Sequence, residues 1–241
     1  MHIEVGTYQM PSTLCIGHRG AGGLLPENTL PSFEQAINIG CEWVELDVYH
    51  VDGELLVIHD KSVDRTTNGE GLVSELSFDE IRALDAGGGH SVPTLQEVIN
   101  LVDRRCRINI ELKGPDTGNP VSDLLSRYCR TEWTPRDFLL SSFDHKELEL
   151  ADPAYPRGVL FAKLLPDMWD RAERLGAWSV NFNKGEVSRS LVEDAHSRGY
   201  KVLAYTVNSN TDILRMIDYG VDGIFSDYPD RVIELRAGPG K

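Results

Sequence analysis

Three acidic side chains lie in two segments that look like neighbouring β-strands. Glu45 and Asp47 are two residues apart in segment 43–48, so an extended strand points both to the same side. Glu111 stands in a similar segment, 107–112, and can bring a third carboxylate within range. Burying carboxylates without a partner is costly, and a divalent cation removes that cost. Three carboxylates with open coordination positions suit a hard ion such as Mg²⁺ or Ca²⁺.

A structural ion-pair network is the alternative interpretation of these acidic residues. For a single acidic pair on a strand, pairing with Arg or Lys is the more common arrangement. The third carboxylate, two nearby histidines and Lys113 reverse that preference here. The sequence therefore predicts a metal site formed by Glu45, Asp47 and Glu111.

Two histidines end strand-like runs close to these carboxylates. His18 and His59 each stand beside a charged residue, and such a pair suits acid/base catalysis of hydrolysis. Arg19 and Lys113 are candidates for binding an anion, since Arg holds phosphate oxygens bidentately and Lys acts as a point charge. An ion pair of Lys113 with Glu111 or Asp47 is the alternative, and both contacts can coexist. The other histidines have no such setting: His2, His50, His90, His145 and His196.

Strand-like and helix-like patterns alternate along the whole chain. Such alternation indicates βα units and a parallel sheet. Eight strand-like segments are present, as in a (β/α)8 barrel, whose chemistry lies at the C-terminal ends of the strands. These segments are residues 13–17, 43–48, 107–112, 138–142, 158–164, 178–182, 201–207 and 223–225. We therefore expect residues 1–241 to form a single TIM-barrel domain.

The helix-like patterns carry recognisable boundaries. Thr94 with Glu97 and Ser77 with Glu80 are spaced as capping boxes at helix N-termini. Gly40, Gly199 and Gly220 follow amphipathic stretches and can supply the left-handed turn that ends a helix.

One stretch interrupts the alternation after the second strand. Asp52-Gly53 is a hairpin signal, and residues 54–59 form another strand-like run. Residues 61–91 are polar, contain glycine and include one short helix pattern. We interpret them as an insertion over the barrel mouth, because long inserts on barrels are usually functional loops.

Composition narrows the possible partners. The chain is 41% hydrophobic and 26% charged, as in globular proteins. Its formal net charge of −14 argues against non-specific nucleic-acid binding and against adsorption to anionic membranes. No apolar run approaches the roughly 18 residues that span a bilayer, so no membrane insertion is expected.

The cysteines and the N-terminus predict a reduced, cytoplasmic location. The four cysteines form no C-x-x-C pair and no disulfide framework, and Cys15 and Cys41 look like small core residues. The first ten residues have neither a basic start nor an apolar stretch, so we expect no signal peptide.

An ordered set of short motifs resembles the glycerophosphodiester phosphodiesterase family. Any single motif is weak, but together they run from about residue 16 to residue 229. The N-terminal motifs are His18-Arg19-Gly20, Pro26-Glu27-Asn28-Thr29, Glu45-Leu46-Asp47-Val48, Asp52-Gly53, His59-Asp60 and Asp64-Arg65-Thr66-Thr67-x-Gly69-x-Gly71. The later motifs are Pro93-Thr94-Leu95-x-Glu97, Glu111-Leu112-Lys113, Ser141-Ser142-Phe143, Tyr205-Thr206-Val207-Asn208, Gly220-Val221-Asp222-Gly223 and Ser226-Asp227-x-Pro229.

This resemblance implies a (β/α)8 barrel that hydrolyses glycerophosphodiesters to glycerol 3-phosphate and an alcohol. It implies that Glu45, Asp47 and Glu111 bind a divalent metal, and that Arg19 and Lys113 contact the phosphate. His18 and His59 would be the acid/base pair, with His18 favoured as the base, although the two roles are exchangeable. The insertion at 61–91 would help to form the glycerol pocket.

Two other functions fit the same barrel. A lysophospholipid- or sphingomyelin-cleaving enzyme would need an apolar groove, for which the insertion offers five candidates: Leu72, Val73, Leu76, Phe78 and Ile81. A non-catalytic phosphodiester-binding barrel would be expected to have lost a metal ligand or a histidine, and none is missing. The sequence favours the glycerophosphodiester hydrolase over both.

Overall fold

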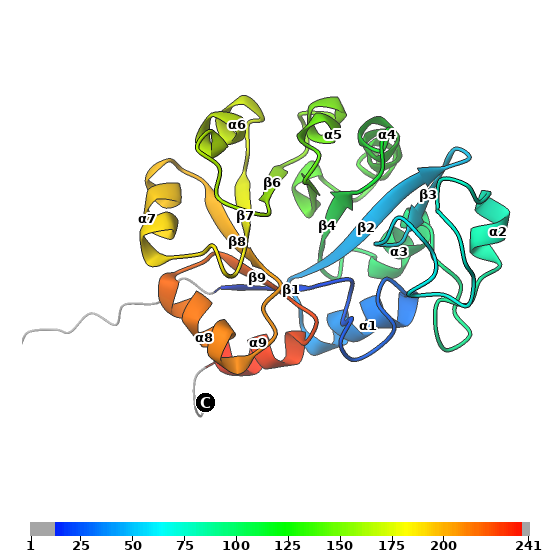
Figure 1. Cartoon of the computed structure of the whole chain (residues 1–241), viewed down its shortest axis with the longest axis horizontal. Helices are drawn as coiled ribbons and strands as arrows, with labels where there is room; N and C mark the ends of the chain where they lie inside the picture. Colours follow the sequence, from blue (N-terminus) through cyan, green and yellow to red (C-terminus); the bar gives the residue numbers. More distant parts are fainter. Residues whose placement is uncertain (1–12, 238–241) are drawn as a thin grey trace, which may run out of the picture.

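The computed structural model describes residues 13–237, in which eight parallel strands close into a ring. The order around the ring is β1-β9-β8-β7-β6-β5-β4-β2, and pairing of β1 with β2 closes it. Figure 1 looks into this ring, with the helices on its outside. The strands are β1 (Leu14–Gly17), β2 (Trp43–Val51), β4 (Arg107–Leu112), β5 (Phe138–Ser142), β6 (Arg157–Phe161), β7 (Ser179–Asn183), β8 (Lys201–Tyr205) and β9 (Gly223–Ser226). The predicted TIM barrel is confirmed.

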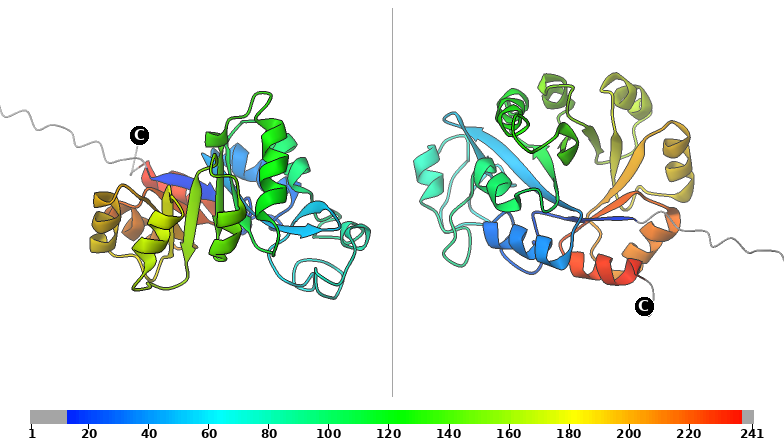
Figure 2. Two further views of the ribbon diagram at one scale, coloured as in Figure 1. Left: turned by 90° about the horizontal axis from the view of Figure 1, so that it is seen from above. Right: turned by 180° about the vertical axis from the view of Figure 1, so that it is seen from behind.

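Helices follow the strands and cover the outside of the ring, as the two further views in Figure 2 illustrate. They are α1 (Leu30–Ile39), α3 (Leu95–Val102), α4 (Gly118–Tyr128), α5 (His145–Leu150), α6 (Met168–Arg174), α7 (Arg189–Ser197), α8 (Asn210–Tyr219) and α9 (Pro229–Arg236), with a 3-10 turn at Pro135–Asp137. The capping box of Thr94 and Glu97 is present at the start of α3. Gly40 and Gly220 end α1 and α8 in the left-handed conformation, as predicted.

Two apolar layers hold the barrel together. The larger lies between the strands and the helices and includes Cys15 and Cys41, whose predicted core positions are confirmed. The smaller fills the barrel interior with five buried side chains: Ile16, Trp43, Leu139, Leu203 and Phe225. Trp43 precedes Glu45 by two residues on β2, so the strand changes from apolar filling to carboxylates towards its C-terminal end.

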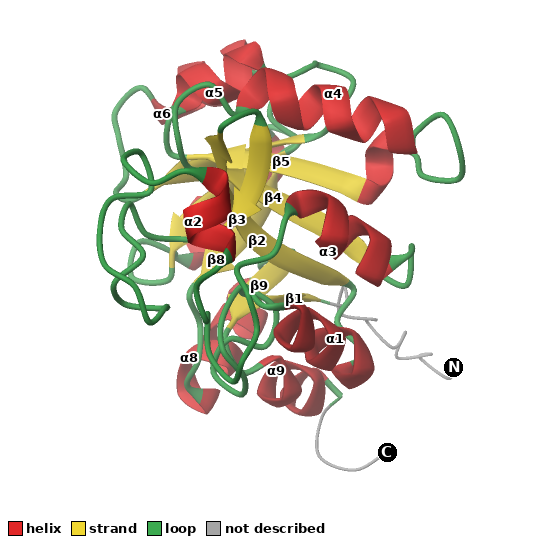
Figure 3. Ribbon diagram, turned by 90° about the vertical axis from the view of Figure 1, so that its right-hand side faces the viewer, coloured by secondary structure: helices red, strands yellow, loops and turns green. Residues whose placement is uncertain are grey.

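The insertion is a small unit with its own core. The strand β3 (Glu54–Val57) pairs antiparallel with β2, and the short helix α2 (Phe78–Arg82) follows it, as predicted. The predicted capping box of Ser77 and Glu80 is present. The buried side chains of this unit are Leu56, Ile58, Val63, Val73, Ile81, Ala86 and Val92. Figures 1 and 3 place α2 beside the ring, next to β3. We expected the insertion to lie over the barrel mouth, but it lies beside the mouth instead.

No helix among residues 13–237 is both long and apolar enough to cross a membrane. The expectation of no signal peptide concerns the first ten residues, which lie outside the described part of the chain.

The turn after β1 depends on Gly20. Its φ of +81° lies in the left-handed region, and an added Cβ would lie 2.6 Å from the backbone and Oγ of Ser32. We expect Gly20→Ala to lower the free energy of unfolding by more than the ~1 kcal/mol that a strained turn alone would cost, because the added Cβ also clashes with the backbone of Ser32. Gly53→Ala is the matched control, since Gly53 has a φ of +85° but open space around it. Chemical denaturation of both variants measures the difference, and equal losses would contradict the clash.

Candidate functional site

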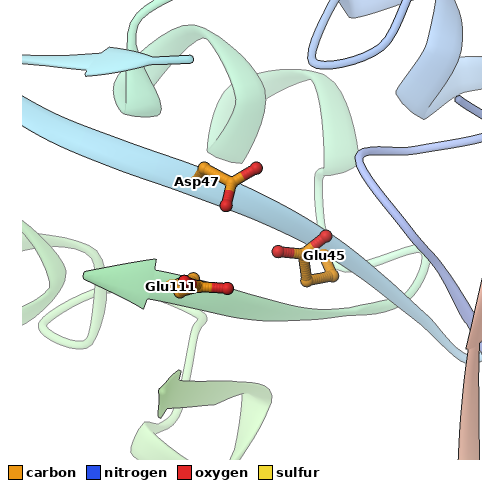
Figure 4. A group of neighbouring side chains, drawn as sticks. All are labelled: Glu45, Asp47 and Glu111. Carbon is orange, nitrogen blue, oxygen red and sulfur yellow. The ribbon is translucent and has the colours of Figure 1, made fainter. Parts of the chain in front are cut away.

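The three predicted carboxylates converge at the C-terminal end of the barrel. Asp47 and Glu111 are paired residues in the register of β2 and β4, and Glu45 lies one step earlier on the same side. One oxygen from each carboxylate lies within 4.8 Å of the others. Figure 4 shows the three side chains turned towards a common space between the two strands. The sequence-based prediction that these residues meet is confirmed.

The negative charge of this group is only partly compensated. Burial, followed by repulsion from Asp47, raises the pKa of Glu111 to about 7. Burial and the charges of Asp47 and Glu111 raise the pKa of Glu45 well above its ordinary value. Asp47 is 1% exposed, and its Oδ1 atom has no hydrogen-bond partner. The site therefore favours an added positive charge.

Arg19 reaches the carboxylates because the turn after β1 is left-handed. Arg19 itself has a φ of 53° and Asn28 a φ of 57°, which are uncommon values outside glycine and are typical of functional loops. The Arg19 backbone N–H donates to Glu45 Oε2 at 2.9 Å, and its side-chain Nε lies 3.5 Å from Asp47 Oδ2. Asn28 Nδ2 donates to the same Asp47 oxygen at 3.0 Å.

Lys113 forms the other positive side of the site. Its Nζ donates to Glu111 Oε1 at 2.9 Å and lies 3.8 Å from Asp47 Oδ1. Burial alone would lower the pKa of Lys113, but these two carboxylates hold it above its ordinary value, so the ammonium group stays protonated. The sequence left an ion pair and an anion contact open for this residue, and the ion pair is present.

Each predicted histidine is held through Nδ1 by a carboxylate. His18 Nδ1 lies 2.6 Å from Asp227 Oδ1, and His59 Nδ1 lies 2.5 Å from Asp60 Oδ1. This arrangement directs Nε2 of both rings towards the site. The Nε2 atom of His18 lies 4.0 Å from Glu45 Oε2, and that of His59 lies 3.2 Å from Lys113 Nζ.

Several polar residues that hold the site had no role in the sequence-based prediction. Asp227 lies 209 residues from His18, and its other oxygen accepts from Asn208 Nδ2 at 2.5 Å. The motifs contained both residues, yet nothing in their spacing placed them beside His18. A polar residue directly after a barrel strand was the available signal, because β9 ends immediately before Asp227.

Two adjoining cavities open at this end of the barrel. The first has a volume of about 190 Å³ and is lined by His18, Arg19, Glu45, His59, Asn109, Glu111, Lys113, Ser141, Phe143, Leu160, Tyr205, Thr206 and Phe225. The second, of about 350 Å³, is lined by Tyr49, His59, Asp60, Lys61, Glu111, Leu112, Lys113, Ser142, Phe143 and Asp144. A wall of four residues is common to both: His59, Glu111, Lys113 and Phe143.

Comparison with known proteins identifies the family. The glycerophosphoryl diester phosphodiesterase family matches residues 18–231, which include every predicted site residue. The chain belongs to this family. It is therefore related to phosphoric diester hydrolases, and the resemblance seen in the motifs is confirmed.

Individual relatives match over nearly their full length. A glycerophosphodiester phosphodiesterase of Caldanaerobacter subterraneus subsp. tengcongensis is 37% identical over 236 residues, covering 92% of this chain and 97% of the relative. One of Bacillus altitudinis is 35% identical over 240 residues, with 93% and 98% covered. The solved structure of an Oleispira antarctica phosphodiesterase with the product sn-glycerol-3-phosphate is similar at a TM-score of 0.85 and 32% identity, with 92% and 96% covered.

Replacing Glu45 by glutamine should stabilise the protein in chelator at a pH above the raised pKa of Glu45, and the gain should disappear at lower pH, where the carboxyl group is already neutral. The amide keeps the shape of the side chain and removes a buried charge that repels Asp47 and Glu111. A gain of about 1 kcal/mol would raise Tm by about 2–4 °C in a protein of this size. Thermal unfolding measures it, with Glu42→Gln as the control, because Glu42 is compensated by two hydrogen bonds from Arg236. A lower Tm for Glu45→Gln would contradict the uncompensated charge.

Proposed function

We propose that the protein hydrolyses glycerophosphodiesters to glycerol 3-phosphate and an alcohol, with the help of a divalent cation. The observation that supports this most directly is the arrangement at the barrel mouth. Three carboxylates converge between two cationic side chains, and two histidines flank them. The family and the product bound in the Oleispira antarctica structure support the same substrate class.

The residues present fit a hard cation such as Mg²⁺ or Ca²⁺. Glu45, Asp47 and Glu111 would hold it, because their oxygens converge and Asp47 Oδ1 has no hydrogen-bond partner. When bound, such an ion offsets negative charge on the phosphate group as the reaction proceeds. An all-protein network does not explain the site equally well, since two cationic side chains face three carboxylates and the pKa of Glu45 stays raised.

Arg19 and Lys113 would bind the phosphate oxygens beside this group. His18 then removes a proton from the attacking oxygen, which is that of water or of the neighbouring glycerol hydroxyl. Water gives glycerol 3-phosphate directly, whereas the hydroxyl first gives a cyclic phosphate, which a water molecule must then open to glycerol 3-phosphate. The new bond to phosphorus forms as the bond to the departing alcohol breaks, and His59 delivers a proton to that alcohol. Asp227 and Asp60 hold the two rings by their Nδ1 atoms, so each proton is exchanged at Nε2.

His59 Nε2 must lose its contact with Lys113 Nζ and gain a proton before it can act as the acid. Burial lowers its pKa, and the protonated Lys113 faces its Nε2 atom, so the free protein has a neutral ring with no proton there. A bound phosphate attracts Lys113 and raises the pKa of His59, because its negative charge favours the imidazolium form. Substrate binding thus prepares the acid that the reaction needs.

The two adjoining cavities suit a phosphodiester, which extends in two directions from phosphorus. Their common wall contains His59 and Lys113, so the phosphate would lie at the junction with one substituent on each side. Within the insertion, Lys61 lines the second cavity, while no insertion residue lines the first. A role of the insertion in recognising glycerol remains a prediction from the family resemblance.

An acyl-binding groove receives little support from the insertion. Val73 and Ile81 are buried in its own core, and Leu76 and Phe78 pack against that core. Leu72 is the exposed member of the five candidates. Cleavage of a lysophospholipid or of sphingomyelin would therefore need apolar contacts from another part of the rim.

Removing the metal should abolish turnover, because three carboxylates would repel the anionic substrate. We expect no hydrolysis of glycerophosphocholine in excess chelator and full recovery with added Mg²⁺ or Ca²⁺. Calorimetry should also detect weaker metal binding in Glu111→Gln, which loses one ligand. Undiminished activity in chelator would exclude the proposed metal dependence.

The two histidine roles can be separated by the leaving group. Without its acid, an alkyl substrate must expel a high-pKa alkoxide, whereas nitrophenolate leaves readily without a proton. We expect His59→Ala to slow the hydrolysis of glycerophosphocholine far more than that of a glycerophospho-nitrophenyl ester. The difference should not exceed the ~10²–10⁴-fold that general acid catalysis contributes. His18→Ala should slow both substrates similarly, if attack limits the rate.

The comparison uses the ratio of kcat/KM between the two substrates for each variant. A leaving-group effect in His18→Ala alone would reverse the assignment. Its absence from both variants would refute the two-histidine model, and another group would have to protonate the alcohol.

A further inference from the structure

Arg65, in the insertion, donates three hydrogen bonds to two carboxylates beside the site. Its Nη1 and Nη2 groups donate to Glu27 Oε2 and Oε1 at 2.7 and 2.8 Å, so this pair is bidentate. Its Nε group contacts Asp60 Oδ2 at 2.6 Å. One planar guanidinium therefore fixes the relative position of Glu27, from the loop after β1, and Asp60, from the segment after β3.

Both carboxylates also hold a residue of the proposed chemistry. Glu27 Oε1 accepts a second hydrogen bond, from Arg19 Nη1 at 2.7 Å. The other oxygen of Asp60 holds His59 Nδ1. A single carboxylate, that of Glu27, therefore links Arg65 to Arg19, the proposed phosphate-binding residue. The carboxylate of Asp60 links it in the same way to His59, the proposed acid.

The three groups of this link, Arg65, Glu27 and Asp60, are all charged at neutral pH. Hydrogen bonds from Arg65 and His59 hold the pKa of Asp60 well below its ordinary value, although burial opposes this. Burial would raise the pKa of Glu27, but hydrogen bonds from Arg65 and Arg19 keep it lowered. Without the guanidinium, two carboxylates that share it would repel each other and move apart.

We propose that Arg65 is a positioning residue, which sets Arg19 and His59 in their working orientations through Glu27 and Asp60. This inference deepens the proposed hydrolysis and rests on it. It means that the insertion acts on the chemistry through an arginine outside both cavities. The guanidinium geometry is essential, because one lysine ammonium cannot form a bidentate pair and a third contact in the same plane.

A purely structural role would give a different result. The Arg65 side chain is 48% exposed, and exposed ion pairs contribute only ~0–1 kcal/mol to stability. The insertion also has its own core, and its other arginine pair, Arg82 with Glu97, is likewise bidentate. Removal of Arg65 should therefore leave the fold intact while misplacing groups whose orientation sets the rate.

The test compares Arg65→Ala, Arg65→Lys and the control Arg82→Ala with the wild type on glycerophosphocholine. We expect Arg65→Ala to lower kcat/KM by about 10–100-fold, the usual effect of losing a group that orients a functional residue. Its Tm should stay close to that of the wild type. Arg65→Lys should remain impaired, and Arg82→Ala should keep wild-type activity.

Chemical rescue and product binding complete the experiment. Millimolar guanidinium ion, but not ammonium, should restore part of the activity of Arg65→Ala, which no effect on folding predicts. Calorimetry should detect weaker binding of sn-glycerol 3-phosphate, because Arg19 is less well oriented.

Wild-type activity in Arg65→Ala, or full activity in Arg65→Lys, would overturn the inference. Failure of the wild type to hydrolyse any glycerophosphodiester would instead refute the proposed function. Product binding would still test the contact through Glu27 and Arg19 in that case, and equal affinities of wild type and Arg65→Ala would overturn the inference separately.

Discussion

Three carboxylates brought into one buried space create a charge that the rest of the site must balance. Glu45, Asp47 and Glu111 converge because β2 and β4 are adjacent and put them on the same side, with Asp47 and Glu111 paired in register and Glu45 two residues earlier. The raised pKa of Glu45 and the unpartnered Asp47 oxygen are consequences of this convergence. Arg19 and Lys113 both face it, and the filling of the barrel interior beneath is largely apolar. The barrel thus accepts a local cost in stability at the place where we propose that a phosphate group reacts.

A second set of carboxylates has a different purpose. Asp227 and Asp60 hold the two histidines, and Glu27 holds Arg19 through a different guanidinium nitrogen from the one near Asp47. Glu27 and Asp60 have lowered pKa values because cationic groups compensate them, in contrast to the raised values in the triad. Acidic residues of one chemical type are therefore divided by their surroundings, some suited to binding a cation and others to orienting His18, His59 and Arg19.

The barrel and the central residues could be predicted because they follow from local patterns. All eight strand-like segments are strands. Period-two spacing puts Glu45 and Asp47 on one side of β2, and the expected pairing with the next parallel strand brings Glu111 to them. The contacts around them depend on features without a local signal. Asp227 meets His18 only because the ring closes, and the reach of Arg19 depends on a backbone φ of 53°. The position of the insertion beside the mouth was also missed, since polarity alone does not reveal which face a loop covers.

The same geometry links the two cationic residues to the proposed cation site. Arg19 and Lys113 face the carboxylates of the triad, and in the proposed reaction they also bind the phosphate of the substrate. While Asp47 and Glu111 are uncompensated, they attract both side chains strongly, and a phosphate must compete for them. Positive charge at the triad weakens that attraction and leaves Arg19 and Lys113 available to the phosphate. Their binding capacity is thus linked to the charge of the triad, so cation and substrate should each favour the binding of the other.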